Sequence, residues 1–379
     1  MRLRHPDGQT VHLGYCTNVH PGEELAEIMA QLDTYATAVR RHVGADRLGL
    51  GLWLAAPVAA QLAADPAAVA RLRRELDVRG LEVVTFNGFP YRSFHAPVVK
   101  YAVYQPDWTT RERLDHTVNL ARVLAGLLPD DAARGSVSTL PLAWRTPWTP
   151  AHSARARRQL DDLAGQLAKL HADTGRPVRV GFEPEPGCVV ETTTQAVAEL
   201  STVDTDYLGV CLDLAHLACA WEVPAGALAR LAGAGLPVVK VQVSAALGAD
   251  RPDEADAALR GYVEPRFLHQ TRAAGGRGAD DLTEALDARL PGPWRVHYHV
   301  PLHAAPQPPL HATLDVLRAG LAALVGGRTA VCDHLDVETY TWSVLPPAQR
   351  PATPAQLAEG IAAELRFTRD ELLALGLTG

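Results

Sequence analysis

Short apolar runs alternate with amphipathic stretches along almost the whole chain. The apolar runs have the length of buried strands, and the stretches between them place apolar residues at helical spacing. One helix is especially clear, because Leu160, Leu163, Leu167 and Leu170 share a face and Gly175 follows as a stop signal. Nine segments are predicted strands: residues 11–16, 48–54, 81–86, 136–140, 179–183, 208–213, 238–244, 294–303 and 335–342.

This alternation predicts a parallel α/β architecture. Eight such strands would close a ring, so we expect a (β/α)8 TIM barrel that forms one domain over residues 1–379. The ninth candidate is then an inserted strand-like segment, and a C-terminal helix carries Leu357, Ile361, Leu365 and Leu372. No Gly-x-Gly-x-x-Gly follows the first strand and no Walker sequence occurs, which argues against dinucleotide-binding and phosphate-loop folds.

Composition narrows the function further. A length of 379 residues with 47% apolar residues supports a large core, and a net charge of -7 gives no reason to expect nucleic acid as a partner. A small-molecule metabolite fits better. The five cysteines are predicted to be buried thiols in a reducing compartment. No signal peptide or long apolar run is visible, so we expect a cytoplasmic protein, and peripheral contact with a membrane complex stays open.

Two neighbouring predicted strands end in acidic residues. The run from Arg179 continues into Glu183-Pro184-Glu185-Pro186-Gly187, and the run from Leu208 ends in Asp213-Leu214-Ala215-His216. In parallel barrels the polar residues that perform chemistry collect at the carboxyl ends of the strands. We therefore predict that the stretch from Arg179 to His216 forms part of an active-site edge.

Four late strands would present a metal ligand at the same end of the barrel. These residues are Glu183, Asp213, Gln242 and Glu338, and His216 lies one helical turn after Asp213. Carboxylates with an amide or imidazole make an oxygen-rich site suited to Mn²⁺, Mg²⁺ or Zn²⁺. We accordingly predict a divalent metal held by these side chains, with His299 as an alternative to Gln242 for the last ligand.

Several of these residues have a second interpretation. Asp213 could cap the helix that begins at Leu214, and Lys240 could form an ion pair with Glu183 or Glu185. Of the histidines at positions 297, 299 and 303 we expect one to be functional and the others structural. The aromatic segment 86–108 lacks helical periodicity, so it is either a substrate-covering loop or a structural loop packed by its own aromatic side chains.

The set Glu183, Asp213-x-x-His216, Gln242 and Glu338 resembles the xylose-isomerase-like TIM-barrel superfamily, which includes sugar epimerases, hydroxypyruvate isomerase and endonuclease IV. The resemblance implies a divalent metal held by a Glu, an Asp, a His or Gln, and a last-strand Glu. The segment Lys240-Val241-Gln242-Val243 is similar to the Gln-bearing strand of the hydroxypyruvate-isomerase branch. Where many epimerases place His, this chain has Gln242.

Longer motifs resemble the EboE family, called metabolite traffic protein. They are residues 13–23, 86–91, 183–188 and 337–342, which read LGYCTNVHPGE, FNGFPY, EPEPGC and VETYTW. This resemblance implies a cytoplasmic TIM barrel that works beside a membrane prenyltransferase in moving secondary-metabolite precursors towards the cell envelope. It implies no defined reaction.

Three functions follow. The first is a metal-dependent isomerase or epimerase acting on a hydroxy-carbonyl or cyclitol-type metabolite, in which Glu183 and Glu338 exchange a carbon-bound proton. His216 and Lys240 complete the candidate catalytic residues. The second is a non-catalytic metabolite carrier that uses the same pocket. The third is a metal-dependent nuclease, which the acidic charge balance disfavours.

Overall fold

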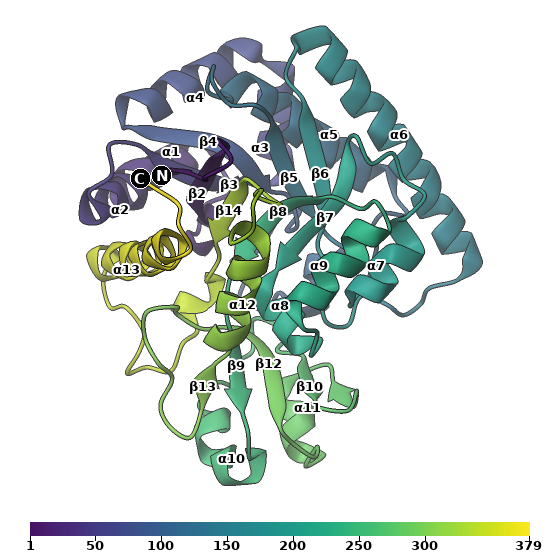
Figure 1. The fold of residues 1–379 in the computed structure, drawn as a ribbon, viewed down its shortest axis with the longest axis vertical. Coiled ribbons are helices and arrows are strands. Elements are labelled where there is room, and N and C mark those ends of the chain that lie inside the picture. The colour runs from purple at the N-terminus through teal and green to yellow at the C-terminus, as the bar shows by residue number, and fades with distance from the viewer.

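The computed structural model describes residues 1–379, and its centre is a closed ring of eight parallel strands. Neighbours around the ring are β2, β14, β8, β7, β6, β5, β4 and β3, and β2 pairs with β3 to close it (Figure 1). The (β/α)8 TIM barrel is thus confirmed. Its strands are β2 (Thr10–Cys16), β3 (Leu48–Trp53), β4 (Leu81–Asn87), β5 (Gly135–Thr139), β6 (Val178–Phe182), β7 (Leu208–Asp213), β8 (Val238–Val243) and β14 (His334–Val337).

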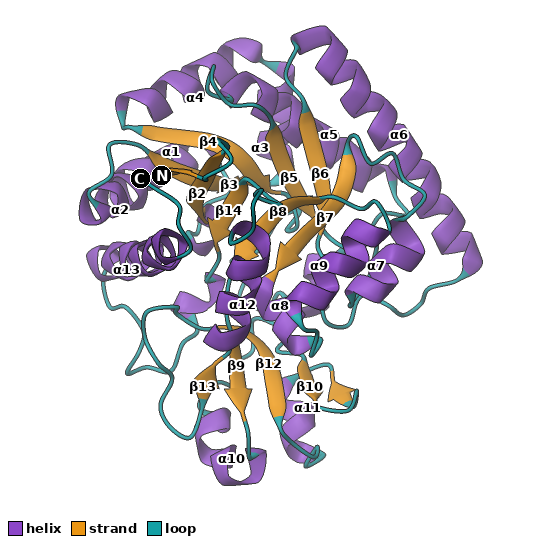
Figure 2. Ribbon diagram, viewed as in Figure 1, coloured by secondary structure: helices purple, strands orange, loops and turns teal.

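Helices surround the ring, as Figure 2 shows in purple around the orange strands. Every residue of β3, β4, β7 and β8 is buried, because the barrel interior covers one face of each strand and the helices cover the other. The helices are α1 (Leu25–Gln31), α2 (Thr37–Val43), α3 (Ala56–Ala64), α4 (Pro66–Val78), α5 (Arg111–Leu127), α6 (Pro150–Thr174), α7 (Thr193–Leu200), α8 (Leu214–Cys219), α9 (Pro224–Gly233), α12 (Leu314–Val325) and α13 (Pro354–Ala374).

Helix α6 shows how local sequence sets these boundaries. Its N-cap is Thr149, whose hydroxyl accepts from the His152 N–H at 3.4 Å, and Pro150 occupies the first turn, where no N–H partner is needed. The helix ends at Gly175, which adopts the left-handed conformation with φ 67°. Between these ends Leu160, Leu163 and Leu167 are buried, as their spacing predicts. The predicted face and stop are therefore confirmed.

The inserted segment is larger than the single strand predicted for it. It is a five-stranded antiparallel sheet in the order β11-β10-β12-β9-β13, placed between β8 and α12. A loop that follows a barrel strand emerges at the carboxyl end of the ring, so this sheet lies at the predicted site, as the green lobe in Figure 1. Its elements are β9 (Ala246–Ala249), α10 (Pro252–Arg260), β10 (Thr271–Ala273), β11 (Gly278–Ala279), α11 (Leu282–Asp287), β12 (Trp294–His299) and β13 (His311–Ala312).

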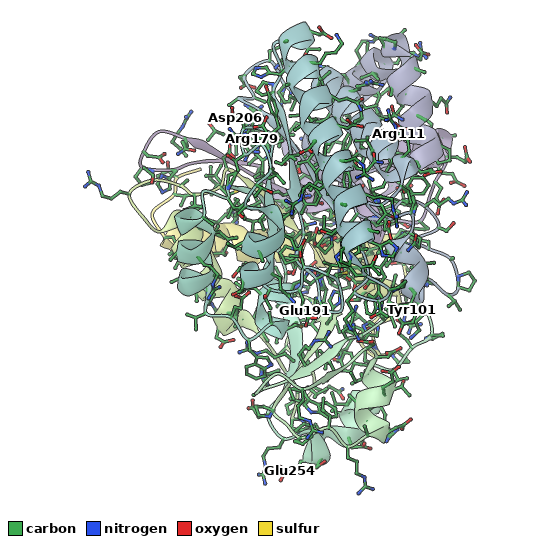
Figure 3. All side chains as sticks on the ribbon, turned by 90° about the vertical axis from the view of Figure 1, so that its right-hand side faces the viewer. Tyr101, Arg111, Arg179, Glu191, Asp206 and Glu254 are labelled. Atoms are coloured by element: carbon green, nitrogen blue, oxygen red, sulfur yellow. The ribbon has the colours of Figure 1, made fainter.

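The insert and the barrel share one hydrophobic cluster. Leu247, Trp294 and Tyr298 of the insert belong to the same buried set as the barrel strands. Figure 3 shows the molecule from the side, with Arg179 and Asp206 towards the barrel's far end, Glu191 and Tyr101 midway, and Glu254 at the tip of the insert.

Smaller features complete the fold. Strand β1 (Arg2–Arg4) pairs antiparallel with β2, and α1 and α2 are joined by a π-helical stretch over Leu32–Ala36. Short 3₁₀ helices cover Thr17–Val19, Lys100–Tyr104 and Tyr340–Ser343. All five cysteines are buried and free, as predicted. No helix combines the length and the apolar run that a membrane crossing requires.

Candidate functional site

The predicted acidic residues meet at the carboxyl end of the barrel. Asp213 is the last residue of β7, and Glu183 and Glu338 directly follow β6 and β14. All three side chains are buried. Ligand atoms of Glu183, Asp213 and His216 lie within 4.8 Å of one another, and so do those of Asp213, His299 and Glu338. The structure therefore brings five of the six predicted metal ligands into one cluster.

Gln242 is the sixth predicted ligand. It lies on β8, paired in register with Asp213 on β7 and with Asp336 on β14. Its side chain is fully buried, yet neither its amide oxygen nor its amide nitrogen has a hydrogen-bond partner. A buried amide without hydrogen-bond partners lowers the free energy of unfolding, so we expect a further group to bind at this position.

Asp213 uses its two carboxylate oxygens differently. Its Oδ1 accepts from the His216 N–H at 2.9 Å and from the Ser244 hydroxyl at 2.7 Å, so Asp213 does cap α8. Its Oδ2 has no hydrogen-bond partner. The capping role and the ligand role are thus compatible, because each occupies one oxygen.

Two asparagines orient Glu338. The Nδ2 atoms of Asn18 and Asn87 each donate to Glu338 Oε1 at 2.8 Å. Asn87 ends β4 and Asn18 lies in the turn after β2, so both amides come from carboxyl ends of barrel strands. Because both donors bind the same oxygen, Oε2 is left for another partner.

The buried atoms without partners define what the site can bind. They include Glu183 Oε2, Asp213 Oδ2, both amide atoms of Gln242, and His299 Nε2. Carboxylate and amide oxygens with an imidazole nitrogen are donors that Mg²⁺, Mn²⁺ and Zn²⁺ accept. The residues present therefore fit a divalent cation.

The carboxyl groups also perturb one another. Burial raises the pKa of Glu183 well above its usual value, and the neighbouring Glu338 and Asp213 raise it further. Burial raises the pKa of Glu338 to about 7. Burial also raises the pKa of Asp213, but His216, His299 and the two hydrogen bonds outweigh it and hold that pKa below its usual value. Without a cation, the three carboxylates do not ionise together easily.

Lys240 does not form the ion pair predicted for it. Its Nζ lies 3.2 Å from Asp336 Oδ2, and both side chains are fully buried inside the barrel. Asp336 packs closely on Gly51, where any side chain would collide with it. Glu185 instead accepts from the Tyr104 hydroxyl at 2.6 Å. The predicted ion pair of Lys240 with Glu183 or Glu185 is therefore wrong, because Lys240 pairs with Asp336. The catalytic role predicted for Lys240 stays a prediction.

Two histidines of the insert reach the site. His297 and His299 lie on β12, where alternate residues share a face, and both line the pocket together with His216. Burial lowers the pKa of His216 to about 4 and that of His297 well below its usual value. His303 lies beyond the strand and stacks on Trp342. Two of the three histidines thus line the pocket, and the expectation that one of them is functional stays a prediction.

Above the polar floor the pocket is apolar. A cavity of about 60 Å³ is lined by both kinds of side chain, and the aromatic segment 86–108 forms much of its cover. Arg113 holds that segment in place by donating to the carbonyls of Gly88 and Phe89 at 3.0 Å each. The apolar wall consists of Phe89, Pro90, Phe94, Val99, Val103, Phe267, Leu268 and Tyr340.

Sequence reasoning missed several residues of the site. Asn18 and Asn87 follow strand ends in the same way as the acids, so the strand-end rule could have found them. Gln270, which accepts from His297 Nδ1 at 2.7 Å, lies in the irregular insert, where no sequence signal marks it.

A (β/α)8 barrel with buried carboxylates at three strand ends defines the class of protein. A family model described as "Xylose isomerase-like TIM barrel" matches residues 37–288, more than half of the chain, and the chain belongs to that family. This match contains Glu183, Asp213 and Gln242 but ends before β12 and Glu338.

Solved structures share the fold at low identity. A putative sugar phosphate isomerase/epimerase from Anabaena variabilis is 16% identical, over 97% of this chain and 100% of that chain, with a TM-score of 0.52. A xylose isomerase-like TIM barrel protein from Mycobacterium smegmatis in complex with magnesium is 15% identical, over 97% and 94%, with a TM-score of 0.51. D-allulose 3-epimerase from Methylomonas sp. is 14% identical, over 96% and 98%, with a TM-score of 0.50. No curated protein matches the sequence.

Proposed function

We propose that the protein is a divalent-metal-dependent isomerase or epimerase acting on a small hydroxy-carbonyl or cyclitol-type metabolite. The observation that carries the proposal is the set of buried ligand atoms without a hydrogen-bond partner on Glu183, Asp213 and Gln242. These three residues, with Glu338, would hold the metal. When bound, Mg²⁺, Mn²⁺ or Zn²⁺ would supply Lewis-acid polarisation of the substrate's oxygens, which acidifies the adjacent C–H bond.

Glu183 and Glu338 are placed to move the proton. Their strands, β6 and β14, are three positions apart in the ring of eight, so the two carboxyl groups approach a substrate from different sides. One carboxylate would take the carbon-bound proton, and the other carboxyl group would return a proton to the opposite face of that carbon.

The apolar wall limits the rest of the substrate. Free sugars carry hydroxyl groups on most carbons, whereas Phe94, Phe267 and Leu268 offer them no hydrogen bonds. The reacting polar part would lie against the carboxylates, and any further part of the substrate that reaches the apolar wall should be apolar.

The test combines metal content with isotope exchange. Purified protein is expected to hold a divalent metal and to incorporate solvent deuterium at one carbon of a hydroxy-carbonyl substrate. Candidates should include hydroxy-ketones with and without an apolar substituent, together with ketoses and cyclitols. Glu338→Gln should abolish exchange, and Glu359→Gln on the exposed side of α13 should not. Metal-free protein that binds ligands equally well without metal would contradict the proposal.

The carrier role implied by the EboE resemblance uses the same pocket. The aromatic cover and the apolar wall support binding of a metabolite as well as its conversion. Glu338→Gln separates the two functions: a carrier would keep pathway output if ligand affinity is unchanged, whereas an enzyme would lose it. Partnership with a membrane prenyltransferase complex and a cytoplasmic location stay predictions.

A further inference from the structure

We propose that His216, His297 and His299 form a second, nitrogen-rich metal position beside the carboxylate site. The proposal goes beyond the proposed function, which needs one metal at the carboxylates. Ligand atoms of the three histidines lie within 4.8 Å of one another, and all three side chains are buried. The Nε2 atoms of His216 and His297 are 2.9 Å apart.

The hydrogen bonds of these histidines fix their protons. Nδ1 of His216 contacts the carbonyl oxygen of Pro184 at 2.9 Å, and Nδ1 of His299 contacts the carbonyl oxygen of Glu338 at 2.8 Å. A carbonyl oxygen only accepts, so each of these Nδ1 atoms must carry the proton. In a neutral imidazole the lone pair is then on Nε2.

Gln270 fixes the third ring in the same way. Its Nε2 donates to the carbonyl oxygen of Pro186 at 2.9 Å, which only an amide nitrogen can do. The amide oxygen of Gln270 therefore faces His297 Nδ1 at 2.7 Å, and that Nδ1 carries the proton. All three rings present an Nε2 lone pair to the same small volume.

This arrangement is unfavourable without a cation. With both Nδ1 atoms protonated, the contact between the Nε2 atoms of His216 and His297 joins two lone pairs, and His299 Nε2 is buried without a partner. Zinc binds imidazole nitrogen at about 2.0–2.1 Å, which places two nitrogens of a tetrahedral site about 3.3 Å apart, slightly more than the 2.9 Å between these two nitrogens. A ligating histidine usually donates its other N–H to a carbonyl or carboxylate, as all three do here.

The donor set determines which metal is preferred. Imidazole nitrogens suit Zn²⁺ and related transition metals, whereas the carboxylate and amide oxygens of the first position also suit Mg²⁺. Asp213 lies between the two positions, 3.9 Å from His216 Nε2 and 3.8 Å from His299 Nε2. The insert therefore adds a transition-metal position to a barrel that supplies an oxygen-rich one.

Metal stoichiometry tests this inference. The intact protein is stripped of metal, saturated with Mg²⁺, and titrated with Zn²⁺ by calorimetry, and bound metal is counted by mass spectrometry after gel filtration. Wild type should still bind one Zn²⁺ tightly and hold two zinc ions when Mg²⁺ is omitted. His297→Gln should lose the tight event, with affinity reduced by more than about 100-fold, and keep one ion. His303→Gln, an exposed histidine just past the same strand, should behave as wild type.

Each other outcome overturns the inference in a distinct way. One zinc ion in wild type and in His297→Gln would mean that a proton, not a metal, separates His216 and His297, and it leaves the carboxylate metal intact. One ion in wild type and none in the variant would mean a single mixed centre. No metal in any protein would refute the proposed function as well. Circular dichroism checks that His297→Gln folds. If the variant does not fold, the number of zinc ions bound by wild type decides whether a second metal position exists.

Discussion

Both ends of the barrel bury carboxylates, but the carboxylates are paired with basic side chains at the amino end and lack such partners at the carboxyl end. At the amino end of β4, Glu82 accepts from Arg2 at 2.7 Å and lies 3.5 Å from His12 and 3.6 Å from Arg47. Burial raises the pKa of Glu82, but His12 and Arg2 outweigh it and lower that pKa to about 2. At the carboxyl end, Glu183 and Asp213 each keep an oxygen without a partner.

The difference shows what burial of a carboxylate means at each end. A buried charge that is paired and hydrogen-bonded belongs to the fold, and its removal leaves the partner uncompensated. A buried carboxylate without a partner either takes up a proton or binds a cation that function supplies. Lys240 does not supply it, because it neutralises Asp336 within the barrel.

The largest expected effect is on metal affinity. Asp213→Asn keeps an oxygen for the His216 N–H and the Ser244 hydroxyl, so the cap on α8 should survive. The substitution replaces the Oδ2 ligand atom with an amide nitrogen, which cannot bind a cation. The affinity for Mn²⁺ should therefore fall by at least ~100-fold, because losing even an outer-shell partner typically lowers metal affinity by about 10–100-fold. Calorimetric titration measures this. Asp130→Asn, at a mostly exposed surface carboxylate, is the control; unchanged affinity in Asp213→Asn would remove Asp213 from the site.

At the opposite end, Glu82→Gln should cost stability and leave metal binding unchanged. The pKa of Glu82 is about 2 in the folded protein, against its ordinary value of 4.5 in the unfolded chain. Because the folded pKa is lowered, the stabilisation is full above pH 4.5 and is lost as pH falls towards 2. The expected cost at pH 7 is about 3 kcal/mol, measured by urea unfolding. A cost that stays constant down to pH 3 would contradict the ion-pair explanation.

In metal-free protein, Glu338→Gln should increase the free energy of unfolding, whereas Glu82→Gln should decrease it. Burial raises the pKa of Glu338 from 4.5 to about 7, so wild type loses stability as pH rises through that interval. The variant should therefore be more stable at pH 8, by about 3 kcal/mol at most, and equal at pH 4. Its amide oxygen can still accept from Asn18 and Asn87.

Added metal should make wild type more stable than Glu338→Gln, because only the carboxylate of wild type binds the cation through its charge. Thermal unfolding with and without Mn²⁺ measures the difference in stability under both conditions. A variant that is less stable than wild type without metal would show that Glu338 is a structural carboxylate like Glu82.

The smallest effect is expected from an orienting residue. Asn18→Ala removes one of two donors to Glu338 Oε1, and Asn87 keeps the other. Metal affinity should fall by about 10-fold, at the low end of outer-shell effects. Asn119→Ala on α5 is the matched control, since no hydrogen bond ties its side chain to the site. Equal losses in both variants would indicate a general loss of stability instead.

Periodicity predicted the barrel because each barrel strand is a local apolar run with an amphipathic helix after it. The same logic located Glu183, Asp213 and Glu338, since strand ends must meet at one edge of a closed parallel ring. What could not be predicted lies in the insert. Its strands β10, β11 and β13 have only two or three residues and pair with distant segments, so they carry no periodic signal.

Side-chain direction was the second limit. Lys240 and Gln242 share a strand face, but only the structure shows that Asp336 occupies the space over Gly51 and attracts Lys240. Likewise, the spacing of His297 and His299 places them on one face of β12, yet the fold of the insert decides that this face meets the barrel.

The central claim is that the buried, unpartnered oxygens at the carboxyl end of the barrel hold a divalent metal. Anomalous scattering from a crystal grown with Mn²⁺ tests it most directly. The account predicts a peak about 2.0–2.3 Å from carboxylate oxygens of Glu183, Asp213 and Glu338. A crystal saturated with Mn²⁺ that shows peaks only at surface carboxylates, with the carboxyl groups of Glu183 and Glu338 unchanged, would contradict it.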